Sequence, residues 1–124
     1  MTTGTPATTG GMRLGVDFGA GIIVIAAGGP GVIVRTLEFP DLSREYPGAG
    51  VTCPVHGVPS LVTYADGKVA GAGSSVLRQG AEDHPATARW LRRYLLENSP
   101  VQIPAGCGRM VKYGEAAADL LIPL

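Results

Sequence analysis

Asp17, Gly19 and Gly21 are the residues of this chain whose types and spacing best suit chemistry. A turn built from glycine and alanine exposes successive backbone N–H groups with no side chain in the way, and such groups form a concavity that binds anions. A neighbouring carboxylate such as that of Asp17 holds a hydrated magnesium ion, which offsets the charge of a phosphate. The pattern therefore indicates a phosphate-binding turn. The alternative is that the glycines only make a tight turn and that Asp17 only ends a strand.

The common nucleotide motifs do not explain this segment. A dinucleotide fingerprint needs a third glycine and a helix that opens onto the pyrophosphate, but the third-glycine position is Val24. The β-branched residues 22–25 favour a strand instead. A Walker motif is excluded because no Gly-Lys-Ser/Thr follows the glycines. The remaining interpretation is a strand that ends near Asp17, a glycine turn and a returning strand.

Two cysteines and two histidines offer a second candidate, a zinc site. Cys53 and His56 have Cys-x-x-His spacing, and His84 with Cys107 would complete a set of four ligands. His84 and Cys107 are 23 residues apart, whereas the ligand pairs of structural zinc sites are closely spaced. The spacing therefore does not predict zinc. No serine, histidine and aspartate occur in a local context that indicates a nucleophile.

Glycine and proline punctuate the elements that would position these residues. Alternating and β-branched patterns predict three strands, over residues 13–17, 22–27 and 32–39. Their connections are so short that they imply an antiparallel meander. Residues 40–57 lack a helical period and predict a long loop, with a short extended piece at residues 51–55.

The second half of the chain is expected to contain a hairpin and helices. Asp66-Gly67 is a hairpin turn signal between predicted strands at residues 58–64 and 68–72. Helical segments are predicted over residues 73–79, 86–98 and 115–121, with a loop or extended passage at 101–108. The expected fold class is thus α/β, a β-meander followed by a hairpin and helices.

Length and composition limit what the chain does. Its 124 residues allow one domain, 45% hydrophobic residues suffice for a core, and the net charge is zero. Scattered, balanced charge does not predict a nucleic-acid or anionic-membrane partner, and no run approaches the ~18 apolar residues of a membrane span. Two cysteines predict a reducing cytoplasm rather than a disulfide scaffold. The Thr- and Gly-rich residues 1–11 are expected to be a disordered arm rather than a signal peptide.

Several segments resemble, in chain order, the DnaK-type chaperones of the heat-shock protein 70 family, which belongs to the actin-like ATPase superfamily. Val16-Asp17-Phe18-Gly19 resembles the family's first phosphate motif, and residues 58–64 are similar to its Pro-Ser strand. Residues 73–79 lie where the family has a glycine-containing turn and a short helix that ends in glutamine. Residues 88–95 resemble the family's basic helix, and residues 115–121 resemble the helix that follows.

The resemblance implies a ribonuclease H-like, actin-like ATPase fold, of which residues 12–124 would be a partial nucleotide-binding domain. It implies ATP or ADP with Mg²⁺ as ligands, and Asp17 as the residue that holds Mg²⁺ through water. The residues implied to contact the β- and γ-phosphates are Gly19, Ala20, Gly21 and Ile22. The family's catalytic lysine would fall on Leu77, which carries no charge, so nucleotide binding is expected without an assigned catalytic residue.

As such an N-terminal segment, the chain would serve a chaperone that couples ATP to the binding of unfolded protein. Clients and co-chaperones would bind regions beyond Leu124. The segment alone is expected to bind nucleotide weakly or not at all, because a concave site needs walls on both sides. The alternative, from a different class, is a small β-rich module that binds a protein partner without nucleotide, with Trp90 and Tyr94 as exposed anchors.

Overall fold

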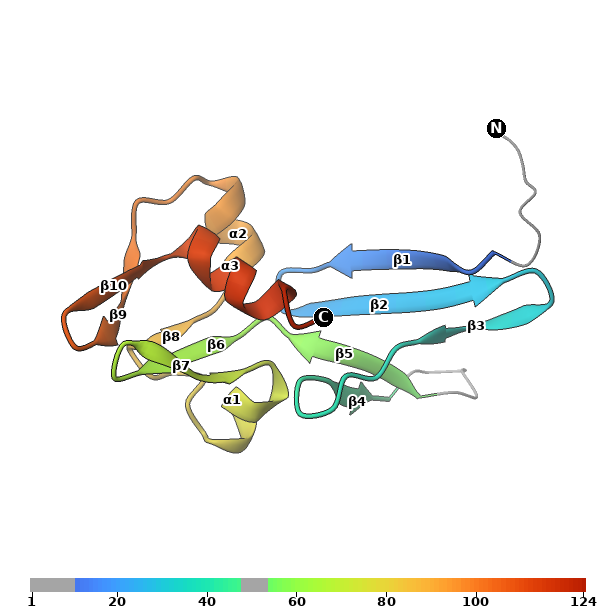
Figure 1. Ribbon diagram of the computed structural model, residues 1–124, viewed down its shortest axis with the longest axis horizontal. Coiled ribbons are helices and arrows are strands. Elements are labelled where there is room, and N and C mark those ends of the chain that lie inside the picture. The colour runs from blue at the N-terminus through green and yellow to red at the C-terminus, as the bar shows by residue number, and fades with distance from the viewer. Residues whose placement is uncertain (1–10, 48–53) are drawn as a thin grey trace.

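The computed structural model describes residues 11–47 and 54–124. Residues 1–10 of the expected arm and residues 51–53 of the expected extended piece, which include Cys53, lie outside this description. The described chain has an α/β fold in which every strand pairing is antiparallel. A five-stranded sheet forms one end of the molecule, and two smaller sheets with the helices form the other (Figure 1).

The five-stranded sheet begins with the predicted meander, which is confirmed. Strand β2 (Ile22–Gly29) pairs with β1 (Arg13–Phe18) on one side and with β3 (Val32–Thr36) on the other. The first two residues of β2 also pair with β5 (Val55–Pro59), which in turn pairs with β4 (Arg44–Tyr46). Since β1 pairs with β2 alone among the described strands, it is an edge strand of this sheet (Figure 1).

The other end of the molecule contains the hairpins and helices. Strand β6 (Val62–Ala65) lies between β7 (Lys68–Ala72) and β8 (Thr87–Ala88), and β9 (Gln102–Gly106) pairs with β10 (Arg109–Lys112). The predicted hairpin turn is confirmed, because Asp66 and Gly67 both have positive φ between β6 and β7. The helices are α1 (Ser74–Arg78), α2 (Leu91–Leu96) and α3 (Tyr113–Leu121).

The core lies where the two ends of the molecule meet. Ile23 and Val58 from the large sheet, Val62 from β6, and Leu91 and Leu120 from the helices are fully or almost fully buried there. The hydroxyl of Tyr64 on β6 donates a 2.6 Å hydrogen bond to the carboxylate of Asp119 on α3. Burial, and then this bond, raise the pKa of Tyr64 well above its ordinary value, so the side chain stays neutral.

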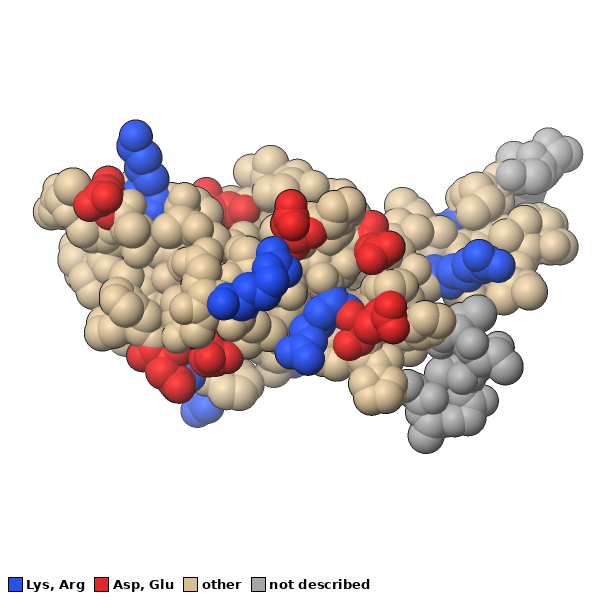
Figure 2. All heavy atoms as spheres, turned by 90° about the horizontal axis from the view of Figure 1, so that it is seen from below, with Lys and Arg blue, Asp and Glu red and all other residues tan. Residues whose placement is uncertain are grey.

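The far ends of β1 and β3 project beyond this core, as Figure 1 shows for the large sheet. On β1, Leu14 is 68% exposed and Val16 is 64% exposed. On β3, Ile33 and Val34 are exposed to a similar extent. The sheet therefore presents apolar side chains to solvent on β1 and on β3. Charged side chains on the face in Figure 2 alternate in sign, and neither sign gathers into a patch.

The helix predicted over residues 86–98 is wrong in its first half. Thr87 and Ala88 form β8 and pair with β6, and Trp90 has a left-handed backbone, so α2 begins only at Leu91. The Thr87 hydroxyl bonds to the Thr63 hydroxyl at 2.8 Å and to the Ala81 carbonyl at 2.6 Å. These small buried residues fit against β6, and that tertiary contact outweighs the helix-forming composition of the segment.

Two further expectations need correction. The strand expected at residues 58–64 is two strands, because the chain turns at Ser60 and Leu61 as it leaves the large sheet. The loop expected at residues 40–57 contains β4 and most of β5. Of the two alternatives for residues 101–108, a loop or an extended passage, the extended one is confirmed by the strand β9. The helix expected at residues 115–121 is confirmed and starts two residues earlier. Within the described residues no helix is long and apolar enough to span a membrane.

Candidate functional site

The turn between β1 and β2 is the tight glycine turn that the sequence predicts. The N–H of Gly19 donates a 2.9 Å hydrogen bond to the carbonyl of Ile22, which closes the turn. A Cβ atom on Gly19 would lie 2.7 Å from that carbonyl oxygen, so the close approach requires glycine here. A Cβ atom on Gly21 would meet nothing within 4 Å, so the tip of the turn is open.

Ala20 and Gly21, at the tip of the turn, keep backbone donors that have no partner among the described residues. The N–H of Gly19 is used within the turn, and the carbonyl of Gly21 accepts a 3.0 Å bond from the N–H of Ser60. In the described part of the chain, no backbone hydrogen bond involves the N–H groups of Ala20 and Gly21. An anion at this turn would therefore be met by Ala20 and Gly21 rather than by Gly19.

A pocket of about 220 Å³ lies beside the turn. Its lining comes from segments that are far apart in the sequence: the turn, the junction between β5 and β6, helix α1, and the segment that leads into α2. The lining residues are Ala20, Gly21, Tyr46, Pro59, Ser60, Leu61, Leu77, Glu82, Arg89 and Trp90. This volume is below the usual range for small-molecule sites, so it suits a phosphate group rather than a whole nucleotide.

The hydroxyl of Ser60 is the most unusual group in this pocket. Ser60 is 1% exposed, and its Oγ has no hydrogen-bond partner among the described residues. A buried hydroxyl without a partner costs about 1–3 kcal/mol of stability, and for that reason such groups are uncommon in folded proteins. Ser60 thus lines the pocket beside the turn, and its hydroxyl is enclosed and unsatisfied among the described residues.

Trp90 contributes an aromatic surface under backbone strain. It has φ 57° and ψ 39°, a left-handed conformation that costs a non-glycine residue about 1–3 kcal/mol and often marks a functional site. Trp90 lines the pocket and is 46% exposed. A half-exposed aromatic residue offers a surface on which a flat ring stacks.

Charges around the pocket balance one another. The Arg89 guanidinium forms an ion pair with Asp83 and a 3.4 Å hydrogen bond to the carbonyl of Glu82. Burial raises the pKa of Tyr46, although Arg44 lowers it, so this phenol remains a neutral donor. The groups that the pocket offers to an anion are therefore neutral N–H and O–H donors rather than a net positive charge.

The structure places Asp17 on β1, paired in register with Val24, and outside the pocket lining. Its carboxylate is exposed and forms no ion pair with a described residue. One such carboxylate suits Mg²⁺, which keeps most of its water and takes its remaining ligands from phosphates. No group of three or more metal-binding side chains occurs among residues 11–47 and 54–124. Of the candidate zinc ligands, Cys107 is exposed at the turn between β9 and β10.

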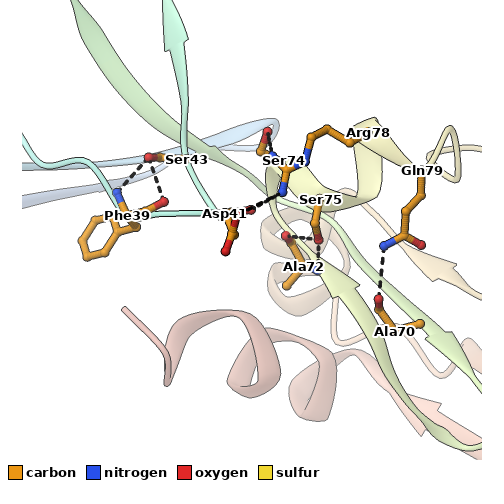
Figure 3. Close-up of polar contacts among 9 residues, drawn as sticks. All are labelled: Phe39, Asp41, Ser43, Ala70, Ala72, Ser74, Ser75, Arg78 and Gln79. Atoms are coloured by element: carbon orange, nitrogen blue, oxygen red, sulfur yellow. Dashed lines mark hydrogen bonds and ion pairs between the residues drawn. The ribbon is translucent and has the colours of Figure 1, made fainter.

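Leu77 and Arg78 take different directions from α1. Leu77 lines the pocket with the turn and Ser60. Figure 3 shows Arg78 extended toward Asp41 and Ser74, with Nη1 donating to the Ser74 Oγ at 3.2 Å and Nη2 lying 3.6 Å from an Asp41 carboxylate oxygen. The cation next to Leu77 in the sequence is therefore held away from the pocket.

The sequence does not indicate Ser60 and Arg89 as site residues, and it suggests Trp90 only as an anchor for a protein partner. The Pro-Ser pair predicts part of a strand, and the residues around Trp90 predict a helix. Their role depends on two chain breaks, at residues 60–61 and at residue 90, that local patterns do not reveal. No protein-family model matches this chain, and no curated protein or solved structure shows significant similarity to it.

Proposed function

We propose that this chain binds the phosphates of a nucleotide at the turn between β1 and β2, as the N-terminal part of the nucleotide-binding domain of a DnaK-type chaperone. One observation supports the proposal above others. The turn, Ser60 and Leu77 belong to three separate segments that resemble that family, and the three line one pocket. An actin-like ATPase fold is part of the same proposal, because the meander and the following hairpin agree with its N-terminal portion.

In this proposal neutral donors bind the phosphates. The N–H groups of Ala20 and Gly21 and the hydroxyl of Ser60 donate to phosphate oxygens, and hydrogen bonds to a charged acceptor are stronger than those between neutral groups. Asp17 holds Mg²⁺ through water, and the ion offsets phosphate charge. Because the pocket holds about 220 Å³, the base lies outside it and stacks on the exposed part of Trp90.

Binding without efficient hydrolysis is what these residues support. Leu77 stands where the family's catalytic lysine is implied, and it brings no charge to the transferred phosphate. Arg78 is engaged with Asp41 and Ser74. ATP and ADP are therefore expected to bind with similar, modest affinity, with a dissociation constant on the order of 1 mM.

The chaperone role follows from the same resemblance. Nucleotide bound by this segment would be coupled, in the cytoplasm, to the binding of unfolded-protein clients and co-chaperones.

The test uses the single tryptophan of the chain as its probe. Mg-ATP, Mg-ADP and inorganic tripolyphosphate are each titrated to roughly 10 mM, which saturates a millimolar site. Trp90 fluorescence and titration calorimetry are measured in parallel. We expect heat with all three ligands, and a fluorescence change with ATP and ADP that tripolyphosphate produces only weakly. Asp17→Ala and Ser60→Ala should each weaken binding, while Ser75→Ala, a serine of α1 outside the pocket, should not. No heat with any ligand would refute the proposal.

A second candidate function, binding of a protein partner without nucleotide, is favoured by the exposed apolar residues of β1 and β3. The two anchors expected for this function, Trp90 and Tyr94, differ in their surroundings. Trp90 is half exposed, but the Tyr94 ring stacks on Tyr113 with ring centroids 4.4 Å apart. The exposed sheet therefore replaces Tyr94 as the surface that this candidate would use.

A further inference from the structure

The outer edge of β1 carries backbone groups that no described strand pairs with. Gly19 bonds to Ile22 across the turn, and hydrogen-bonded pairs alternate with non-bonded pairs along an antiparallel ladder. The N–H and C=O groups of Leu14, Val16 and Phe18 consequently point outward. The same alternation accounts for the bond from the Leu37 N–H to the Ile25 carbonyl on the other side of β2.

Most side chains of this edge strand are also exposed. Leu14 and Val16 are mostly exposed on one face. Arg13 and Asp17 are exposed on the opposite face, and neither forms an ion pair with a described residue. They are four positions apart on an extended strand, about 13 Å, so they cannot pair with each other. Long apolar edges of this kind favour pairing with another strand.

We propose that β1 pairs in antiparallel fashion with β1 of a second copy of this chain, about a twofold axis at Gly15. Arg13 of one copy then lies opposite Asp17 of the other, and by symmetry this pair of opposite charges occurs twice. Leu14 lies opposite Val16 of the other copy, and this pair exchanges both of its outward hydrogen bonds. The two large sheets become one continuous sheet.

Charge complementarity selects this register. In a symmetric pairing the outward backbone groups of the two copies must face one another. The registers nearest to an axis at Gly15 therefore have the twofold axis at Leu14 or at Val16. An axis at Leu14 puts Arg13 opposite Gly15, and an axis at Val16 puts Asp17 opposite Gly15. Only the axis at Gly15 opposes both charges. The residues on β1 and β2 nearest the two ion pairs, Gly15 and Ala26, are small and line a hollow of about 570 Å³, and the bulkier Val34 lies farther off, against Gly28.

Sedimentation equilibrium between roughly 10 μM and 1 mM, in buffer with EDTA so that no divalent cation occupies Asp17, tests this proposal. We expect a monomer–dimer equilibrium. Arg13→Asp and Asp17→Arg should each weaken the dimer at least about tenfold, because each turns two attractive cross-strand pairs into two repulsive ones. The double variant R13D/D17R restores the opposition of charge and should recover the dimer.

A matched pair of substitutions locates the interface. Val16 and Val34 have almost equal exposure, 64% and 67%, on β1 and β3. Val16→Lys should abolish the dimer and Val34→Lys should leave it intact, with circular dichroism confirming that both variants fold. A chain that is monomeric at 1 mM overturns the proposal, as does growth beyond a dimer, loss of the dimer with Val34→Lys alone, or failure of the double variant to recover it. The experiment contains no nucleotide, so its outcome is independent of the proposed function.

Discussion

Replacing Ser60 with alanine should make the protein more stable. The Ser60 hydroxyl is buried without a partner among the described residues, so the folded state bears a desolvation cost that the unfolded state does not. Ser60→Ala removes this cost and keeps the backbone bond from residue 60 to the Gly21 carbonyl. We expect the free energy of unfolding to rise by about 1 kcal/mol and the melting temperature by roughly 4 °C.

Urea denaturation measures this change directly. The transition midpoint should move to higher urea while its slope stays the same, because the surface exposed on unfolding hardly changes. Ser75→Ala is the matched control. The Ser75 hydroxyl accepts a 2.9 Å bond from the Ala72 N–H and donates a 2.8 Å bond to the Ala72 carbonyl (Figure 3). Its loss should lower stability by roughly 0.5–1.5 kcal/mol for each bond.

The prediction is that the same change, serine to alanine, raises the free energy of unfolding at position 60 and lowers it at position 75. A Ser60→Ala variant that loses more than about 0.5 kcal/mol would mean that the hydroxyl is already bonded in the folded protein. The hydroxyl would then not be available to a phosphate, and the reasoning that assigns Ser60 to the site would fail. A variant that gains stability and also loses tripolyphosphate binding would show a group kept for a ligand at the expense of the fold.

Other positions give further predictions. Gly19→Ala should lose roughly 1–3 kcal/mol in urea denaturation, because its Cβ would meet the Ile22 carbonyl, whereas Gly21→Ala, with open space around it, should lose less than about 0.5 kcal/mol. Leu77→Lys should strengthen tripolyphosphate binding about fivefold or more in calorimetry by adding a cation to the pocket lining, and unchanged affinity would contradict the position of Leu77. The raised pKa of Tyr64 means that the folded state keeps this proton above pH 10 while the unfolded state loses it. Stability should therefore fall as the pH rises above about 10, and Tyr64→Phe should reduce that fall, as thermal melts at several pH values would show.

The parts of the fold that the sequence predicts are those in which local chemistry decides. β-branched runs and glycine turns define β1, β2 and β3, and the Asp66-Gly67 pair sets the β6–β7 hairpin through its positive φ values. The segment at residues 86–90 illustrates the limit. Its composition favours a helix, but burial of Thr87 and Ala88 against β6 decides the outcome, and that contact spans more than twenty residues of sequence.

The candidate site, too, could be predicted from the sequence only where local chemistry decides the structure. The turn at Gly19 was predictable, because two glycines between two strands leave few alternatives. The pocket was not, because it depends on where the chain turns at Ser60 and on the left-handed backbone of Trp90. Neither feature has a local signal, since proline and serine also occur inside strands and tryptophan rarely adopts positive φ.

Asp17 is required by both proposals, and this makes them interdependent. Its carboxylate holds hydrated Mg²⁺ in the nucleotide complex and faces Arg13 of the second copy in the dimer, and it cannot do both at once. Thermodynamic linkage then requires Mg-ATP to weaken the dimer by the same factor by which dimerisation weakens Mg-ATP binding. Sedimentation with Mg-ATP should shift the chain toward monomer, whereas ATP with EDTA should shift it less. A dimer that gains strength with Mg-ATP would show that Asp17 does not hold the ion, that the Arg13–Asp17 pairing is wrong, or both. The charge-swapped double variant separates these cases, because it dimerises only if the pairing is right.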